Sequence, residues 1–169
     1  MKNIRIMLSV LFCSTLLLAI TANGAEVAKP NPGQSIPIQI LGKTIEIRKG
    51  MTRSDAKAAL SSVIKDETSL DTAERLQYDV PLVPGSAPVA IVFDFDKKGI
   101  VNGFMLDANL KKQNPAAVKL VDWLGANVGK PTVKKKGNAT WNFGGWKIEH
   151  TEGGSGEDSV YRIELTPSK

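Results

Sequence analysis

The sequence predicts an α+β fold in which two helices pack against an antiparallel sheet. Apolar and polar residues alternate along several short segments, which is typical of strands with one buried face. Two other segments carry apolar residues at the spacing of an amphipathic helix. The predicted strands come in runs joined by short turns, and the helices stand apart from these runs. This order is typical of α+β proteins rather than of parallel α/β folds.

The chain that precedes the main strands forms a strand pair and a helix. Alternation over residues 36–40 resumes at 45–47 after a turn, which predicts two strands. Thr52 is a favoured N-cap residue, and Asp55 lies three residues later, where it can complete a capping box. A helix therefore begins here, and its apolar face comprises Ala56, Ala59, Leu60, Val63 and Ile64.

A run of strands follows this helix. We expect strands over residues 75–83, 89–95 and 100–106, of which the second has the strongest pattern. Asn102–Gly103 lies too close to the preceding turn to form a hairpin of its own. We therefore interpret Gly103 as a β-bulge, a position where glycine is common within strands.

The second helix begins at Asn114, an N-cap residue, followed by Pro115 at the favoured first helical position. It ends near Gly129, and its predicted apolar face comprises Val118, Val121, Leu124 and Val128. Residues 139–143 and 146–150 then form a hairpin around a Gly-Gly turn, and residues 159–165 form the last strand.

The N-terminal residues 1–25 are typical of a secretory signal peptide. A short basic start precedes a 15-residue apolar run, and small residues near Gly24–Ala25 offer a cleavage site. The run is shorter than the roughly 20 residues of a transmembrane helix, so we expect no stable membrane anchor. Cys13 lies inside the run behind bulky residues, which disfavours lipidation. Residues 26–35, rich in proline, would form an extended tether, and the mature protein would be periplasmic or secreted.

Residues 36–169 are predicted to form a single α+β domain, since about 135 residues suffice for one compact core. The halves 36–110 and 111–169 echo each other, because each places a helix before a run of strands. Two tandem helix-plus-meander units would explain this echo.

Composition and residue counts exclude several classes of function. The net charge is +5, but residues 1–24 hold two cations and no acid, so the rest of the chain carries only +3. Its lysines are scattered rather than concentrated in a stripe, which disfavours nucleic-acid binding. One Cys and one His disfavour a zinc site, and we expect no cofactor. The acidic loop Glu152–Asp158 leaves weak cation binding open.

We expect no catalytic residues of the nucleophilic type. A Ser–His–Asp triad would have to use His150, which alternates with apolar residues at the end of a strand. Ser155 nearby lies in a Gly-rich loop that lacks the strand-to-helix turn of a nucleophile elbow. Acid–base work by a pair of carboxylates stays open, because a sequence does not show which carboxylates meet.

The aromatic hairpin is the candidate binding site. Trp141, Phe143 and Trp146 fall on one face of it, and Lys147 and Glu149 belong to the other. One interpretation places the aromatic face in the core beneath the helices. A second exposes part of it as a partner-binding patch, since tryptophan is common in interface hot spots, and the candidate partner-binding residues are then Trp141, Phe143, Trp146, Lys147 and Glu149. A third is carbohydrate stacking on the aromatic rings.

The segment Gly50-Met51-Thr52, with Ala56 and Leu60 after it, resembles the helix start of β-lactamase-inhibitor-protein-like bacterial envelope domains. That group includes the small lipoprotein of the outer-membrane barrel-assembly machinery. The second half resembles the same unit more loosely at Leu124–Gly125, Gly129–Pro131 and Thr140–Phe143. The resemblance implies tandem helix-plus-meander units whose curved sheet holds a protein partner without chemistry.

These observations favour a periplasmic, non-enzymatic protein-binding module of inhibitor or immunity type. Its partner would be another periplasmic or envelope protein. A factor for envelope assembly or maintenance is the first alternative. An enzyme that acts on cell-wall material through carboxylates is the second.

Overall fold

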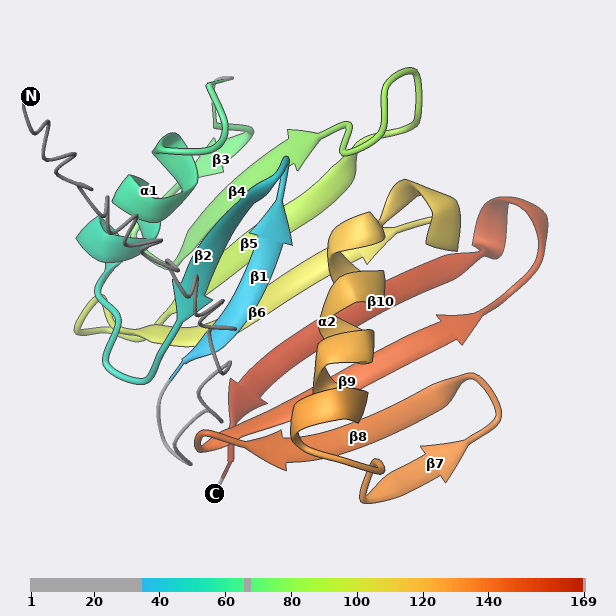
Figure 1. The fold of residues 1–169 in the computed structure, drawn as a ribbon. Coiled ribbons are helices and arrows are strands. Elements are labelled where there is room, and N and C mark those ends of the chain that lie inside the picture. The colour runs from blue at the N-terminus through green and yellow to red at the C-terminus, as the bar shows by residue number, and fades with distance from the viewer. Residues whose placement is uncertain (1–34, 66–67, 169) are drawn as a thin grey trace, which may run out of the picture.

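The computed structural model describes residues 35–65 and 68–168, which form an eight-stranded antiparallel sheet, a two-stranded sheet and two α-helices (Figure 1). The predicted α+β class is therefore confirmed. The elements are β1 (Ile36–Ile40), β2 (Lys43–Ile47), α1 (Arg53–Ser61), β3 (Leu70–Asp71), β4 (Arg75–Val80), β5 (Val89–Phe95), β6 (Val101–Ala108), α2 (Pro115–Asn127), β7 (Val133–Lys135), β8 (Asn138–Phe143), β9 (Trp146–Gly153) and β10 (Val160–Pro167).

The strand order of the large sheet is β3-β4-β5-β6-β10-β9-β8-β7. The first half of the chain thus contributes α1 and the meander β3–β6, and the second half contributes α2 and the meander β7–β10. The two meanders join through their last strands, because β6 pairs antiparallel with β10. We call this β6–β10 junction the seam. The layout of a helix followed by a meander occurs in both halves, whereas the β1–β2 hairpin precedes α1 alone.

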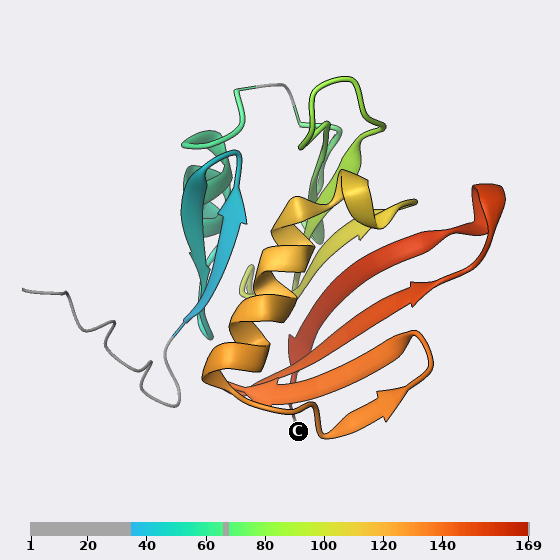
Figure 2. The same ribbon diagram turned by 45° about the vertical axis from the view of Figure 1, so that its right-hand side comes forward.

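The β1–β2 hairpin does not join the large sheet. Its isoleucines alternate, as the sequence indicates, and their side chains are buried in the core. The turn places Leu41 at φ 47° and Gly42 at φ 79°, the positive dihedrals of a tight two-residue turn. Figure 2 shows the hairpin beside α1 and α2, all on the same side of the large sheet. The core lies between this mixed layer and the sheet.

Both helices begin where their caps predict. Thr52 and Asp55 form the capping box of α1, and the Asn114 side chain accepts a hydrogen bond from the Ala117 amide of α2. The predicted apolar face of α2 is partly wrong. Its fully buried residues are Ala116, Ala117, Leu120 and Leu124, whereas Val118, Val121 and Val128 are half-buried at the edge of the contact. The buried stripe is therefore rotated toward Ala116 and Ala117.

Other boundaries differ from the sequence prediction in detail. Strand β4 ends at Val80 rather than Val83, where the chain turns away from β5. The pairing of β5 with β6 shifts between Asp94–Gly103 and Phe95–Val101, which leaves Asn102 as the extra residue of a bulge beside Gly103. Strands β3 and β7 at the two sheet edges were not predicted, because they have only two and three residues.

The predicted signal peptide (1–25) and all of the tether (26–35) except residue 35 lie outside the described residues. Within the ranges 35–65 and 68–168, neither helix is long and apolar enough to cross a membrane.

Candidate functional site

Within residues 35–65 and 68–168, no helix covers one face of the eight-stranded sheet. The alternation of each strand directs its other side chains into the core, where they meet α1, α2 and the β1–β2 hairpin. We call the uncovered side the open face. Its residues are Arg75, Gln77, Asp79, Ala90, Val92, Asp94, Gly103, Met105, Asp107, Asn138, Thr140, Asn142, Lys147, Glu149, Thr151, Arg162, Glu164 and Thr166.

Two cross-strand ion pairs fix four of the charged side chains of the open face. The Arg75 guanidinium donates through Nε and Nη2 to the two oxygens of Asp94, its register partner, at 2.7 and 3.2 Å. Arg162 pairs with Asp107, also its register partner, at 2.6 Å. In each case the hydrogen bond to the carboxylate raises the arginine pKa. Such half-exposed pairs add little stability, so their main effect is to fix where each charge lies.

A hollow of about 400 Å³ lies on the open face at the seam. Gly103 lacks a side chain here, and the hollow is bounded by Arg75 and Asp94 on one side and by Arg162, Glu164 and Thr166 on the other. Residues 75 and 164 belong to opposite halves of the chain, so the hollow exists only because the two meanders join. The sequence predicts a bulge at Gly103 but contains no signal for this hollow.

A second hollow of about 680 Å³ adjoins the first. Its lining includes Asn142, Lys147 and Ser168, and Thr166 belongs to both hollows. The two hollows therefore adjoin at Thr166 on the open face. The open face is therefore hollowed rather than flat, so another molecular surface could be complementary to it in shape.

The predicted aromatic patch is wrong for both tryptophans. Trp146 is 0% exposed and Trp141 is 4% exposed, because α2 packs over this face of the hairpin. The Trp141 indole Nε1 donates a hydrogen bond of 3.0 Å to the Gly129 carbonyl just beyond α2. These side chains therefore belong to the core, which was the first interpretation of the hairpin, and they have no surface left for a partner.

The remaining three predicted residues are divided between the layers. Phe143 is half-buried, and its ring packs edge-on against Trp123 of α2, with centroids 5.5 Å apart. Lys147 and Glu149 lie on the open face, where their ammonium and carboxylate groups pair at 2.8 Å. The predicted hairpin register is confirmed, since Phe143 pairs with Trp146 and Trp141 with Ile148.

His150 lies at the rim of the core rather than in a catalytic arrangement. Its ring packs edge-on against Tyr161, with centroids 4.9 Å apart, and no described residue forms a hydrogen bond with its Nε2. Burial lowers the pKa of His150 and raises that of Tyr161 to about 12. Among the described residues, no three His, Cys, Asp or Glu side chains converge as metal ligands, and this includes the acidic loop Glu152–Asp158.

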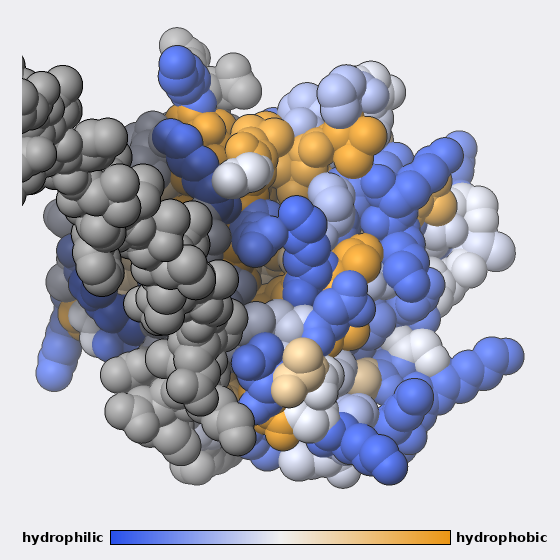
Figure 3. Space-filling view, viewed as in Figure 1, coloured by the Kyte–Doolittle hydropathy of each residue, from blue (hydrophilic) through white to orange (hydrophobic). Residues whose placement is uncertain are grey.

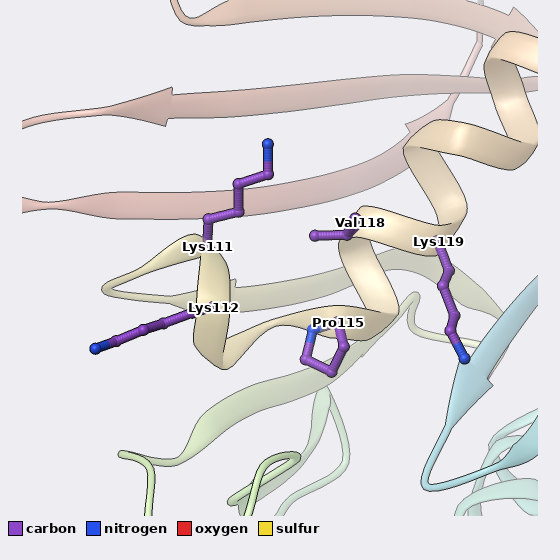
Figure 4. A pocket seen from close by; sticks show the side chains of 5 residues that line it. All are labelled: Lys111, Lys112, Pro115, Val118 and Lys119. Atoms are coloured by element: carbon purple, nitrogen blue, oxygen red, sulfur yellow. The ribbon is translucent and has the colours of Figure 1, made fainter.

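The opposite side of the molecule carries a different depression. It has a volume of about 490 Å³, and Pro115 and Val118 form its apolar floor (Figure 4). The lysines around it, Lys111, Lys112 and Lys119, point their ammonium groups away from one another. They do not converge on one ligand atom. Figure 3 views this helical side, where apolar residues form separate patches among charged ones.

Comparison with known proteins adds little to this geometry. No family model matches the chain, and no curated protein matches it. A solved structure of a DUF4309 family protein, YjgB from Bacillus subtilis, is similar over 69% of this chain and 78% of its own, with 10% sequence identity and a TM-score of 0.41.

Proposed function

We propose that this chain is a periplasmic, non-enzymatic protein-binding module, of inhibitor or immunity type, and that the open face of its sheet contacts the partner. The observation that carries the proposal is the uncovered face itself. In the part of the chain that the structure describes, the sheet has eight strands and the helices lie on one side of it only. Its open side combines fixed charges of both signs with a depression across the seam.

The size of the open face fits a protein partner. Its six longer strands lie about 4.8 Å apart and rise about 3.3 Å per residue, so they span roughly 29 Å by 20–26 Å. The resulting area of roughly 580–750 Å² approaches the roughly 800 Å² that each partner buries in a standard protein–protein interface. Paired charges in fixed positions favour recognition by charge complementarity, which governs specificity and association rate.

The location in the proposal rests on the N-terminal residues. A basic start, a 15-residue apolar run and small residues at Gly24–Ala25 are typical of an exported precursor. Removal of that segment would also remove Cys13, the one cysteine of the chain. A thiol-free mature protein is well suited to an oxidising compartment. Intact-mass analysis of the exported protein tests this, since cleavage near Ala25 should remove about 25 residues.

The binding test uses charge reversal on the open face. Lys147→Glu combined with Glu149→Lys keeps the ion pair and the net charge but inverts the local charge pattern. The exported chain is immobilised, periplasmic extract of the source bacterium is applied, and retained proteins are identified and purified for titration. We expect the reversed variant to bind the partner at least about tenfold more weakly, because like charges across an interface cost several kcal/mol.

The matched control exchanges charges on the helical layer. Lys119→Asp with Asp122→Lys also conserves net charge, and both residues are exposed on α2. This control should bind like the original chain. If the two variants bind equally, or if no protein is retained, the open face is not a protein-binding surface. Circular dichroism of both variants should confirm that each is folded.

A further inference from the structure

We propose that the partner protein presents a cationic side chain to the hollow at the seam, where the Glu164 carboxylate is its counterion. This inference rests on the proposed function, because it takes the open face as the contact surface. It adds the chemistry of the partner, which is a basic protein surface that meets an acidic sheet face.

The open face is acidic although the chain as a whole is basic. Its acids are Asp79, Asp94, Asp107, Glu149 and Glu164, and its bases are Arg75, Lys147 and Arg162. These five acids and three bases give the face a net charge of −2, whereas the whole sequence carries +5. The positive excess therefore lies entirely outside this face. Such a separation of charge steers a partner of opposite sign toward the acidic side.

Pairing within the face neutralises most of these charges but not that of Glu164. Each base already has its own acid, in the pairs Arg75–Asp94, Arg162–Asp107 and Lys147–Glu149. The Asp79 carboxylate accepts hydrogen bonds from the Gln77 amide at 2.9 and 3.2 Å. Within the described residues, the Glu164 carboxylate forms no ion pair and accepts no side-chain hydrogen bond. It is therefore the carboxylate of this face that is free to take a cation from outside.

The neighbours of Glu164 also favour an added cation. Its register partner on β9 is Glu149, and like charges directly opposite one another on adjacent strands are destabilising. Lys147 neutralises one of these two carboxylates, that of Glu149. Arg162, two residues before Glu164 on β10, gives its hydrogen bond to Asp107 instead. A cation held at Glu164 would relieve the repulsion that remains.

The hollow beside Glu164 suits the stem of a long basic side chain. It has a volume of about 400 Å³, and both Gly103, which has no side chain, and the flexible, apolar Met105 line it. Basic side chains bury their methylene stems against such surface while the charged group stays beside polar ones. A partner that covers the hollow would also remove water from the Glu164 carboxylate, which is costly unless a donor replaces it. An ammonium or guanidinium group supplies that donor.

The experiment titrates N-acetyl-lysinamide into the ¹⁵N-labelled exported protein at low ionic strength and follows amide chemical shifts. The largest shifts should occur at Gly103, Met105 and Glu164, and added salt should weaken the binding because it screens the charges. The norleucine analogue keeps the stem but lacks the ammonium group, so it should bind about threefold more weakly, and the glutamate analogue more weakly still. Equal binding of the norleucine analogue, or no shift at these amides, would overturn the inference.

Two substitutions with opposite expected effects test the counterion itself. Glu164→Gln removes the charge but keeps the shape, so it should abolish the advantage of the lysine analogue over the norleucine analogue. Its urea midpoint should not fall, because the substitution also removes the repulsion with Glu149. Lys147→Gln leaves the Glu149 carboxylate unpaired beside Glu164, so it should strengthen binding of the lysine analogue by about threefold. The control, Glu46→Gln, removes an exposed carboxylate of β2 and should bind like the original chain. If Lys147→Gln weakens binding, or Glu164→Gln leaves it unchanged, Glu164 is not the counterion.

Failure of this inference is separable from failure of the proposed function. If charge reversal at residues 147 and 149 abolishes partner binding but the lysine analogue does not shift the seam amides, the contact face is correct and its cationic occupant is wrong. If the analogue binds as expected but charge reversal leaves partner binding unchanged, the hollow binds cations and the proposed contact face is wrong.

Discussion

Replacement of Asn114 should destabilise the protein more than removal of an ordinary helix cap. Its side chain is 0% exposed and makes two hydrogen bonds. Oδ1 accepts from the Ala117 amide at 3.1 Å, which caps α2, and Nδ2 donates to the Tyr161 carbonyl of β10 at 3.2 Å. The residue therefore joins the helical layer to the second meander, 47 positions later in the chain.

The cost of Asn114→Ala follows from these two bonds. Loss of the cap costs about 1 kcal/mol, and a buried carbonyl that loses its donor costs about 1–3 kcal/mol more. We expect the free energy of unfolding to fall by about 2–4 kcal/mol. The control is Thr52→Ala, which removes the exposed cap of α1 and should cost only about 1 kcal/mol.

Urea denaturation followed by tryptophan fluorescence measures both values. Asn114→Asp adds a sharper test, because aspartate caps helices as well as asparagine does. Here it would remove the donor and direct a carboxylate at the Tyr161 carbonyl, so it should be no more stable than Asn114→Ala. If Asn114→Asp is neutral, or if Asn114→Ala costs no more than Thr52→Ala, the bond to β10 contributes nothing and the reasoning is refuted.

Three further predictions concern the core, the first turn and acid stability. Trp146→Ala should lower the free energy of unfolding by about 3–5 kcal/mol in the same assay, whereas a surface tryptophan would cost far less. Leu41→Asn should raise it by up to about 1 kcal/mol, because asparagine tolerates the φ of 47° that strains leucine, and the side chain is half-exposed. Burial lowers the pKa of His150 in the folded protein, so the unfolded state binds the proton first as the pH falls. The free energy of unfolding should therefore decline below about pH 6.5. His150→Gln should flatten this decline in urea titrations at about pH 5 and 7.5.

Local signals predicted most of the elements. The caps at Thr52 and Asn114 satisfy backbone amides within their own helices, and the Gly-Gly turn sets the register of β8 and β9 by itself. Strands β3 and β7 have no such signal. With two and three residues they are too short to show a period, and they form because a longer neighbour offers its edge. The separation of the β1–β2 hairpin from the large sheet is likewise decided by packing.

The candidate site was predicted only in part, because alternation separates two faces of a strand without saying which face the helices cover. The aromatic face of β8 and β9 was predicted as a binding patch because of its residue types. Large aromatic side chains contribute most when buried, and α2 takes that face, which leaves Lys147 and Glu149 on the other. Once it is known which face the helices cover, the same alternation assigns the strand residues of the open face.

The seam could not have been predicted from local pattern. It depends on the pairing of β6 with β10, and its ion pair joins Asp107 to Arg162 across 55 positions of sequence. Each half alone would present β6 or β10 as an unpaired edge, which proteins generally cover. Joining the meanders removes both edges and creates a continuous face, with Gly103 near its middle. A glycine inside a confident strand was the one sequence signal, since it marks a bulge or a close approach. Here the structure shows both the bulge and a hollow lined by this glycine.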